Sequence, residues 1–225
     1  MIPYYILMGV IMLASWLVQK SLQKKFEKYS QMPLQSGLSG KEVAEKMLRE
    51  SGVHGVDILS VQGRLTDHYN PRDKTVNLSP EVYSGRSVMA AAVAAHECGH
   101  AVQHARAYAF LGMRSSLVPV ISFSSKYMQW VLLGGILLIN TFPYLLLAGI
   151  IMFAFTTLFA FVTLPVEFDA TNRAKAWLND SNLTTAEEQK GVSDALSAAA
   201  KTYVVAALSS LATLLYYVMI FLRRR

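Results

Sequence analysis

The feature that most constrains this chain is a stretch of about 40 residues, 127–166, without a single charged side chain. It is too long for one membrane span and long enough for two, because one span needs roughly 20 residues. Asn140, Thr141 and Pro143 lie near its middle and have the chemistry of a turn. We therefore predict a transmembrane hairpin over 116–165, with spans at about 120–140 and 143–164 and Lys126 reaching toward one membrane surface.

Two further apolar tracts, at 2–18 and 203–222, are the other candidate spans. No small-residue cleavage motif follows the first tract, so it is expected to be an uncleaved anchor rather than a secretory signal. Only 16% of all residues are charged, against roughly 25% in ordinary soluble domains. These features predict about four transmembrane helices, with spans in 1–19, 116–165 and 203–225 and two polar segments, 20–115 and 166–202, between them.

The basic residues suggest how these segments are oriented. Basic residues favour the cytoplasmic side of a bacterial membrane. Those in and beside the polar segments outnumber the three arginines at the C-terminus, so both polar segments are expected to be cytoplasmic. The three arginines by themselves favour the opposite orientation. The basic residues are Lys20, Lys24, Lys25, Lys28, Arg106, Arg114, Arg173 and Lys175, against Arg223, Arg224 and Arg225. No basic motif interleaved with aromatic residues accompanies the net charge of +6, so the expected partner is the lipid bilayer and not nucleic acid.

The first polar segment has the signals of a small mixed domain. Ser39 and Glu42 form a capping pattern ahead of an amphipathic helix, and 56–61 alternates like a strand. Residues 64–69 and 75–78 flank a turn at Asn70-Pro71, which predicts an antiparallel hairpin. The Ala-rich stretch 87–105 favours a helix. The second polar segment is expected to be helical, with a break at 179–182.

The sequence His96-Glu97-Cys98-Gly99-His100 lies in the Ala-rich helix. Two imidazoles at i and i+4 share one helical face and can bind one Zn²⁺, while Glu97 can deprotonate a water that the metal has acidified to a pKa of about 7. The same carboxylate can then pass the proton to a leaving amine. Three specified residues at this spacing rarely occur by chance, so we expect one zinc ion per chain and a hydrolytic reaction.

A catalytic zinc site needs a third protein ligand. His104, a further i+4 step along, lies too far along a straight helix to converge on the same ion, and His54 and His68 lie in strand or loop sequence. Glu167 stands at the end of a predicted span, where an unpaired carboxylate would be costly. Two spans separate it from His100, and an even number returns the chain to the same side. Glu167 is therefore the expected third ligand.

These residues carry a family resemblance. The metal helix together with Glu167-Phe168-Asp169-Ala170 resembles membrane gluzincins of the HtpX and CaaX-prenyl-protease type. The whole chain is similar to the YugP-type family of neutral zinc metallopeptidases, through 67–71, 76–79, the metal helix and 165–170. The resemblance implies zinc bound by His96, His100 and Glu167, with Glu97 as the base. The HtpX pattern has an Asp where this chain has Thr171, so Asp169 is a candidate for hydrogen bonding behind the ligands, as is His104.

The expected fold is a mainly α membrane protein of about four spans with a small α+β zincin-like metallopeptidase domain. Zincins hold a peptide or protein substrate as an added strand at a sheet edge. Val76, Asn77 and Leu78 form the candidate edge, although simple packing of the hairpin on the helix explains them equally well. Donors to the oxyanion could come from His68, Arg173 or Tyr203, between which the sequence does not choose.

Two functions from different classes follow. The first is a zinc-dependent endopeptidase acting at the membrane surface, for which resemblance to HtpX implies removal of damaged membrane proteins. The alternative is a non-catalytic membrane scaffold or regulatory protein with a structural or vestigial zinc site, closed by a further ligand such as Cys98 or His104. Glu97 favours catalysis, because a structural site has no use for a carboxylate beside its ligands.

Overall fold

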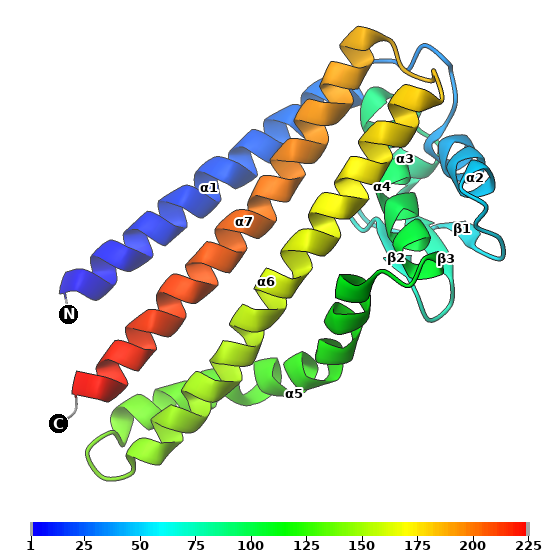
Figure 1. Cartoon of the computed structure of the whole chain (residues 1–225). Helices are drawn as coiled ribbons and strands as arrows, with labels where there is room; N and C mark the ends of the chain where they lie inside the picture. Colours follow the sequence, from blue (N-terminus) through cyan, green and yellow to red (C-terminus); the bar gives the residue numbers. More distant parts are fainter. Residues whose placement is uncertain (1, 224–225) are drawn as a thin grey trace.

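The computed structural model describes residues 2–223, with side chains from Tyr5 onward, so Arg224 and Arg225 lie outside the described residues. Four long helices form an elongated bundle, and the remaining elements gather at one end of it, opposite the two chain termini (Figure 1). The long helices are α1 (Ile2–Ser30), α5 (Ala109–Leu137), α6 (Pro143–Asp180) and α7 (Ala186–Arg223). The small end contains α2 (Gly40–Glu50), α3 (Pro80–Tyr83), α4 (Val88–Ala105), β1 (Asp57–Ser60), β2 (His68–Asn70) and β3 (Thr75–Leu78).

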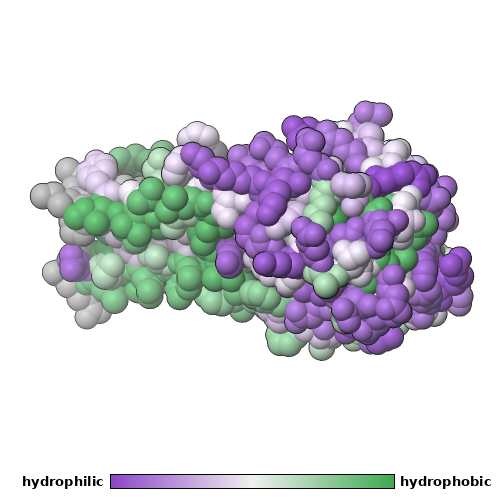
Figure 2. All heavy atoms as spheres, turned by 90° about the horizontal axis from the view of Figure 1, so that it is seen from above, coloured by the Kyte–Doolittle hydropathy of each residue, from purple (hydrophilic) through white to green (hydrophobic). Residues whose placement is uncertain are grey.

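The surface divides along the bundle into a hydrophobic half and a hydrophilic half that contains the small elements (Figure 2). Within the described residues, three helices are long and apolar enough to cross a membrane, namely α1, α6 and α7. They coincide with three of the predicted spans. The predicted span at 120–140 is helical too, but polar side chains dilute its first half, so its crossing stays a prediction. These side chains are Ser122, Ser124, Ser125, Lys126 and Gln129.

The long helices run across the predicted segment boundaries without interruption. α1 continues past the lysine cluster to Ser30, and α7 begins in the polar region at Ala186. Their polar ends are joined by Asp194, which accepts hydrogen bonds from Lys25 and, at 2.9 Å, from the hydroxyl of Tyr29. These bonds hold the polar ends of α1 and α7 together, and both helices contact α4 there.

The sheet has the order β1-β3-β2. β2 and β3 form the predicted antiparallel hairpin, whereas β1 pairs parallel to the other side of β3. The prediction that Val76, Asn77 and Leu78 provide an open edge is wrong, because both sides of β3 are paired and all three residues are buried. The open edge nearest α4 belongs to β2.

The predicted start of α2 is confirmed: Ser39 and Glu42 form a complete capping box. α4 begins after Ser87 as predicted, and the side chain of Ser87 accepts a hydrogen bond from the backbone N–H of Ala90. The many alanines of α4 are buried among α2, α6 and α7, where small side chains allow close approach. Gly99 packs directly against the backbone of Ala170 on α6. A Cβ at position 99 would lie 2.7 Å from the carbonyl oxygen of Ala170.

Two interruptions shape the helices around this core. α6 and α7 are separated by a break at 181–185, which overlaps the predicted break at 179–182 but begins two residues later. Within it, Asn182 has a positive φ of 53°. α5 is bent (Figure 1) and contains Pro119, which removes a backbone donor and is a common cause of bending. The bend turns the first part of α5 toward α4 and leaves the rest beside α6.

Candidate metal centre

The structure brings together His96 and His100 on α4 and Glu167 on α6. The Nε2 atoms of His96 and His100 lie 3.3 and 3.7 Å from Oε2 of Glu167, and one ligand atom from each residue falls within 4.8 Å of the others. Bonds of about 2.1 Å in a tetrahedral zinc site place ligand atoms about 3.4 Å apart. The two measured distances bracket that value, so the three side chains could hold one ion.

Glu167 has the environment of a ligand. The residue is 2% exposed, and its buried Oε2 has no hydrogen-bond partner among the described residues. A buried carboxylate oxygen left without a partner is costly, and a cation between Glu167 and the imidazoles would remove that cost. Two imidazoles and one carboxylate are also a donor set that zinc accepts.

The field at the site favours positive charge. Burial lowers the pKa of His100, but the carboxylates of Glu167 and Glu97, together with Gln103, more than offset burial and raise that pKa above its ordinary value. The same arrangement of carboxylates would stabilise a bound cation.

A hydrogen-bond chain behind His100 links the two helices. Nδ1 of His100 lies 3.0 Å from Oε1 of Gln103, whose Nε2 donates to the backbone oxygen of Val166 at 2.7 Å and to Asp169 at 2.8 Å. Because the amide nitrogen faces two acceptors, its oxygen is the acceptor toward His100. Nδ1 then carries the proton, and Nε2 presents its lone pair to the metal position. Asp169 accepts a further bond from Nε of Arg173 at 2.5 Å.

His96 is supported in a different way. Its Nδ1 lies 3.4 Å from the hydroxyl oxygen of Thr171, which stands where the HtpX pattern has an Asp. Asp169, by contrast, reaches the ligands only through Gln103. A neutral hydroxyl behind one imidazole and an amide behind the other therefore take the places that carboxylates often occupy behind zinc-bound histidines.

A cavity of about 270 Å³ opens beside the three ligands. Glu97 lines it, 8% exposed, as do His68 from β2 and Tyr203 from α7. Arg114 of α5 also lines it and lies 3.5 Å from Oε1 of Glu167. The complete lining is Asp67, His68, Tyr69, Pro71, His96, Glu97, His100, Leu111, Arg114, Ser115, Val118, Phe159, Glu167 and Tyr203.

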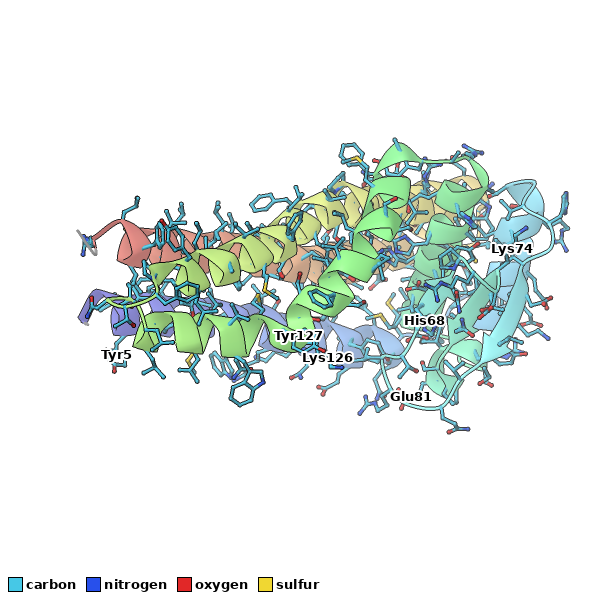
Figure 3. All side chains as sticks on the ribbon, turned by 90° about the horizontal axis from the view of Figure 1, so that it is seen from below. Tyr5, His68, Lys74, Glu81, Lys126 and Tyr127 are labelled. Atoms are coloured by element: carbon cyan, nitrogen blue, oxygen red, sulfur yellow. The ribbon has the colours of Figure 1, made fainter. Side chains whose placement is uncertain are left out.

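The other predicted residues take distinct places. His68 lies at the hydrophilic end, far from Tyr5, with Lys126 and Tyr127 of α5 between them (Figure 3). Nδ1 of His68 is 2.7 Å from the backbone oxygen of Thr66. Arg173 is absent from the lining of the cavity, and its guanidinium pairs with Asp169.

Neither candidate for a closing fourth ligand joins the three residues. Nδ1 of His104 lies 2.8 Å from the hydroxyl of Tyr69, so its contact is with β2. Cys98 is fully buried on another face of α4, with Sγ 3.7 Å from the backbone oxygen of Ala44. Burial and the nearby carboxylate of Glu97 raise the pKa of its thiol, so it stays protonated.

Three residues at the site were not foreseen as members of it. Gln103 follows His100 by three positions, a spacing that lets helical side chains meet, so its sequence position held a weak signal. Thr171 drew attention only because the HtpX pattern has an Asp at its position. Arg114 comes from a separate helix, and no local pattern connects it with Glu167.

A family model described as "putative neutral zinc metallopeptidase" matches residues 4–222. The chain belongs to this zinc metallopeptidase family. It is also 42% identical over 225 residues, covering all of this chain and 99% of the relative, to a protein of Bacillus subtilis (strain 168) called "Putative membrane protease YugP". A search of the solved structures finds no match.

Membership confirms the resemblance to the YugP-type family of neutral zinc metallopeptidases. It supports a peptidase-type hydrolase that uses zinc, and His96, His100 and Glu167 are a group that could bind the metal. The three apolar helices and the relative's description as a membrane protease support association with a membrane.

Proposed function

We propose that this protein is a zinc-dependent endopeptidase that hydrolyses peptide bonds of proteins or peptides at the membrane surface. One observation carries the proposal: His96, His100 and Glu167 converge beside a cavity that Glu97 also lines. Histidines and a glutamate could bind a metal without the cavity, but hydrolysis also needs a base and room for a substrate.

The residues of the cavity divide the reaction between them. Zinc, when bound, supplies the Lewis acid that allows water to ionise near neutral pH. The carboxylate of Glu97 accepts the proton of the attacking water and afterwards delivers it to the nitrogen of the leaving amine. The hydroxyl of Tyr203, which lines the cavity, is the donor that we assign to the developing oxyanion. His68 lines the cavity too, but its Nδ1 donates to the backbone oxygen of Thr66, which leaves Nε2 of the neutral imidazole as an acceptor.

Arg173, the remaining candidate for an oxyanion donor, has a different role in this proposal. Its guanidinium holds Asp169, which in turn holds Gln103 behind His100. Arg173 therefore orients ligands and does not contact the substrate. The free edge of β2, instead of β3, is the position for a substrate strand.

The placement of the cavity favours substrates at the membrane. Its walls include Val118 of α5, Phe159 of α6 and Tyr203 of α7, as well as residues of β2. Phe159 belongs to the apolar part of a helix long enough to cross a bilayer. The proposed substrates are segments of membrane proteins that lie close to the bilayer. The proposed role is quality control of membrane proteins, with the active site on the cytoplasmic side of the bacterial membrane.

The scaffold alternative explains less of the site. A structural zinc site is closed by four protein ligands, whereas the described residues contain one metal-binding group, of three members. His104 and Cys98 have other contacts. A three-ligand site beside a cavity with a glutamate is the arrangement that hydrolysis requires.

The test uses the full chain purified in detergent, with zinc per chain measured by elemental analysis and hydrolysis measured on fluorescently labelled casein. Glu97→Gln is expected to retain zinc and lose activity by about 10²- to 10⁴-fold, the contribution typical of a general base. His100→Ala and Glu167→Ala are expected to lose zinc and activity together. Glu187→Gln, which changes an exposed glutamate of α7, is the matched control and should alter neither.

Each result has a definite meaning. Full activity in Glu97→Gln would refute the proposed base. Unchanged zinc in Glu167→Ala would remove this residue from the ligand set. A wild-type protein that binds one zinc ion but has no hydrolytic activity on any peptide or protein would favour the scaffold.

A further inference from the structure

A second cavity, of about 400 Å³, lies beside the metal cavity. The two share Pro71, Leu111 and Ser115 in their linings, so they are neighbours along one surface. The walls of the second cavity are mostly apolar. Its lining is Pro71, Arg72, Gln103, His104, Ala107, Tyr108, Ala109, Leu111, Gly112 and Ser115.

The strand β2 connects the two cavities. His68 and Tyr69 on β2 line the metal cavity, and Pro71 and Arg72, directly after the strand, line the second cavity. Among residues 2–223, no strand pairs with the edge of β2 that faces away from β3. A peptide in extended conformation advances about 3.3 Å per residue. Because the two linings share residues, a peptide bound at the metal can reach the second cavity within a few residues.

We propose that the second cavity is a substrate subsite, which receives a large apolar side chain of the peptide bound at the metal, a few residues from the cleaved bond. The inference rests on the proposed peptidase function and adds a substrate preference to it. Leucine- or phenylalanine-sized side chains match walls made of Leu111, Tyr108, Pro71 and two alanines. Their burial should improve binding by about tenfold or more over a polar residue at the same position.

Gly112 offers a way to fill this cavity alone. It lines the second cavity and not the metal cavity, and a Cβ at this position would meet nothing within 4 Å. Gly112→Phe therefore adds a ring at the wall of the second cavity, where the Cβ meets no other atom. Ala109→Phe, also at an exposed lining residue of this cavity alone, is the second variant. Gly9→Phe, at an equally open glycine of α1, is the matched control.

The experiment measures binding without cleavage. Zinc-loaded, full-length Glu97→Gln protein in detergent is mixed with ten-residue peptides that each carry one photo-leucine, and the cross-linked residues are identified by mass spectrometry. We expect photo-leucine at one position to label 107–112 while a position a few residues away labels the metal cavity. Gly112→Phe or Ala109→Phe should reduce labelling of 107–112 by about tenfold or more, and Gly9→Phe should not.

Zinc per chain, measured in every variant, shows that the metal site is intact. Labelling of the metal cavity alone would overturn the subsite and leave the peptidase proposal standing. Labelling at neither cavity would overturn both proposals. Phospholipid and unlabelled peptide are each added as competitors. If phospholipid abolishes the labelling of 107–112 and unlabelled peptide does not, the second cavity binds an acyl chain and the subsite is overturned.

Discussion

Gly99 lies between the two histidines of the motif, and its replacement by alanine tests how the metal site is assembled. A Cβ at this position would lie 2.7 Å from the carbonyl oxygen of Ala170 and 3.1 Å from its Cα. Both atoms belong to the backbone of α6 and cannot move aside as a side-chain tip could. Ala170 follows Glu167 by less than one helical turn, so the third ligand moves with it.

The magnitude follows from these distances. The contact with the carbonyl oxygen is about 0.7 Å short of the 3.4 Å at which ordinary van der Waals contact begins. Zinc–ligand distances tolerate only about 0.2 Å, so a shift of this size should weaken zinc binding by about 10- to 100-fold, the range found when support behind a ligand is lost. Overpacking costs about 1–3 kcal/mol of stability, but alanine in place of glycine returns about 1 kcal/mol of helix propensity.

Zinc affinity is therefore a sharper measure than stability. It is obtained by competition with a fluorescent zinc chelator on detergent-purified protein, beside thermal unfolding of the same samples. Gly9→Ala is the control, because its Cβ would meet nothing and only the helix-propensity gain remains. A folded Gly99→Ala protein that binds zinc as tightly as the wild type would show that the spacing of α4 and α6 does not determine the site.

Further predictions concern residues around the site. Gln103→Leu removes the amide that joins His100 to α6, and should weaken zinc binding by about 10- to 100-fold in the same competition assay. Ser39→Ala removes the N-cap of α2 and should lower the free energy of unfolding by about 1 kcal/mol in denaturant titrations. Hydrogen bonds from Ser39 lower the pKa of Glu42, so the cap should persist above the ordinary glutamate pKa and be lost only as the pH falls through the lowered value. Cys98 should resist iodoacetamide in the native protein and react after unfolding, and fast native labelling would contradict its burial.

The parts of the fold that sequence predicted well are those with local signals. The capping residues at Ser39, the turn at Asn70-Pro71 and the break near Asn182 each mark a boundary through their own backbone chemistry. The histidine pair is local as well, since i and i+4 positions meet on any helix. Glu167 required one step more, a count of spans that returns the chain to the same end of the bundle.

The misplaced substrate edge has a non-local cause. β2 and β3 are joined by a short turn, so their pairing was visible in the sequence. β1 pairs with β3 in parallel across a longer connection, and nothing in its four residues identifies that partner. A strand becomes central or peripheral only through all of its partners, so the sequence of β3 alone could not reveal that its second side was occupied.

The hydrogen bonding behind the ligands was hidden for a related reason. Asp169 and Thr171 lie two residues apart on α6, and on a helix this spacing turns their side chains in different directions. Which of them supports which imidazole depends on how α6 is rotated against α4, and Gly99 fixes the contact at which the two helices touch. With that contact in place, Thr171 faces His96 and Asp169 faces Gln103. A substitution that rotates α6 would displace these neighbours together with Glu167, which lies on the same helix, so zinc affinity should depend on the helix contact as strongly as on the residues behind the histidines.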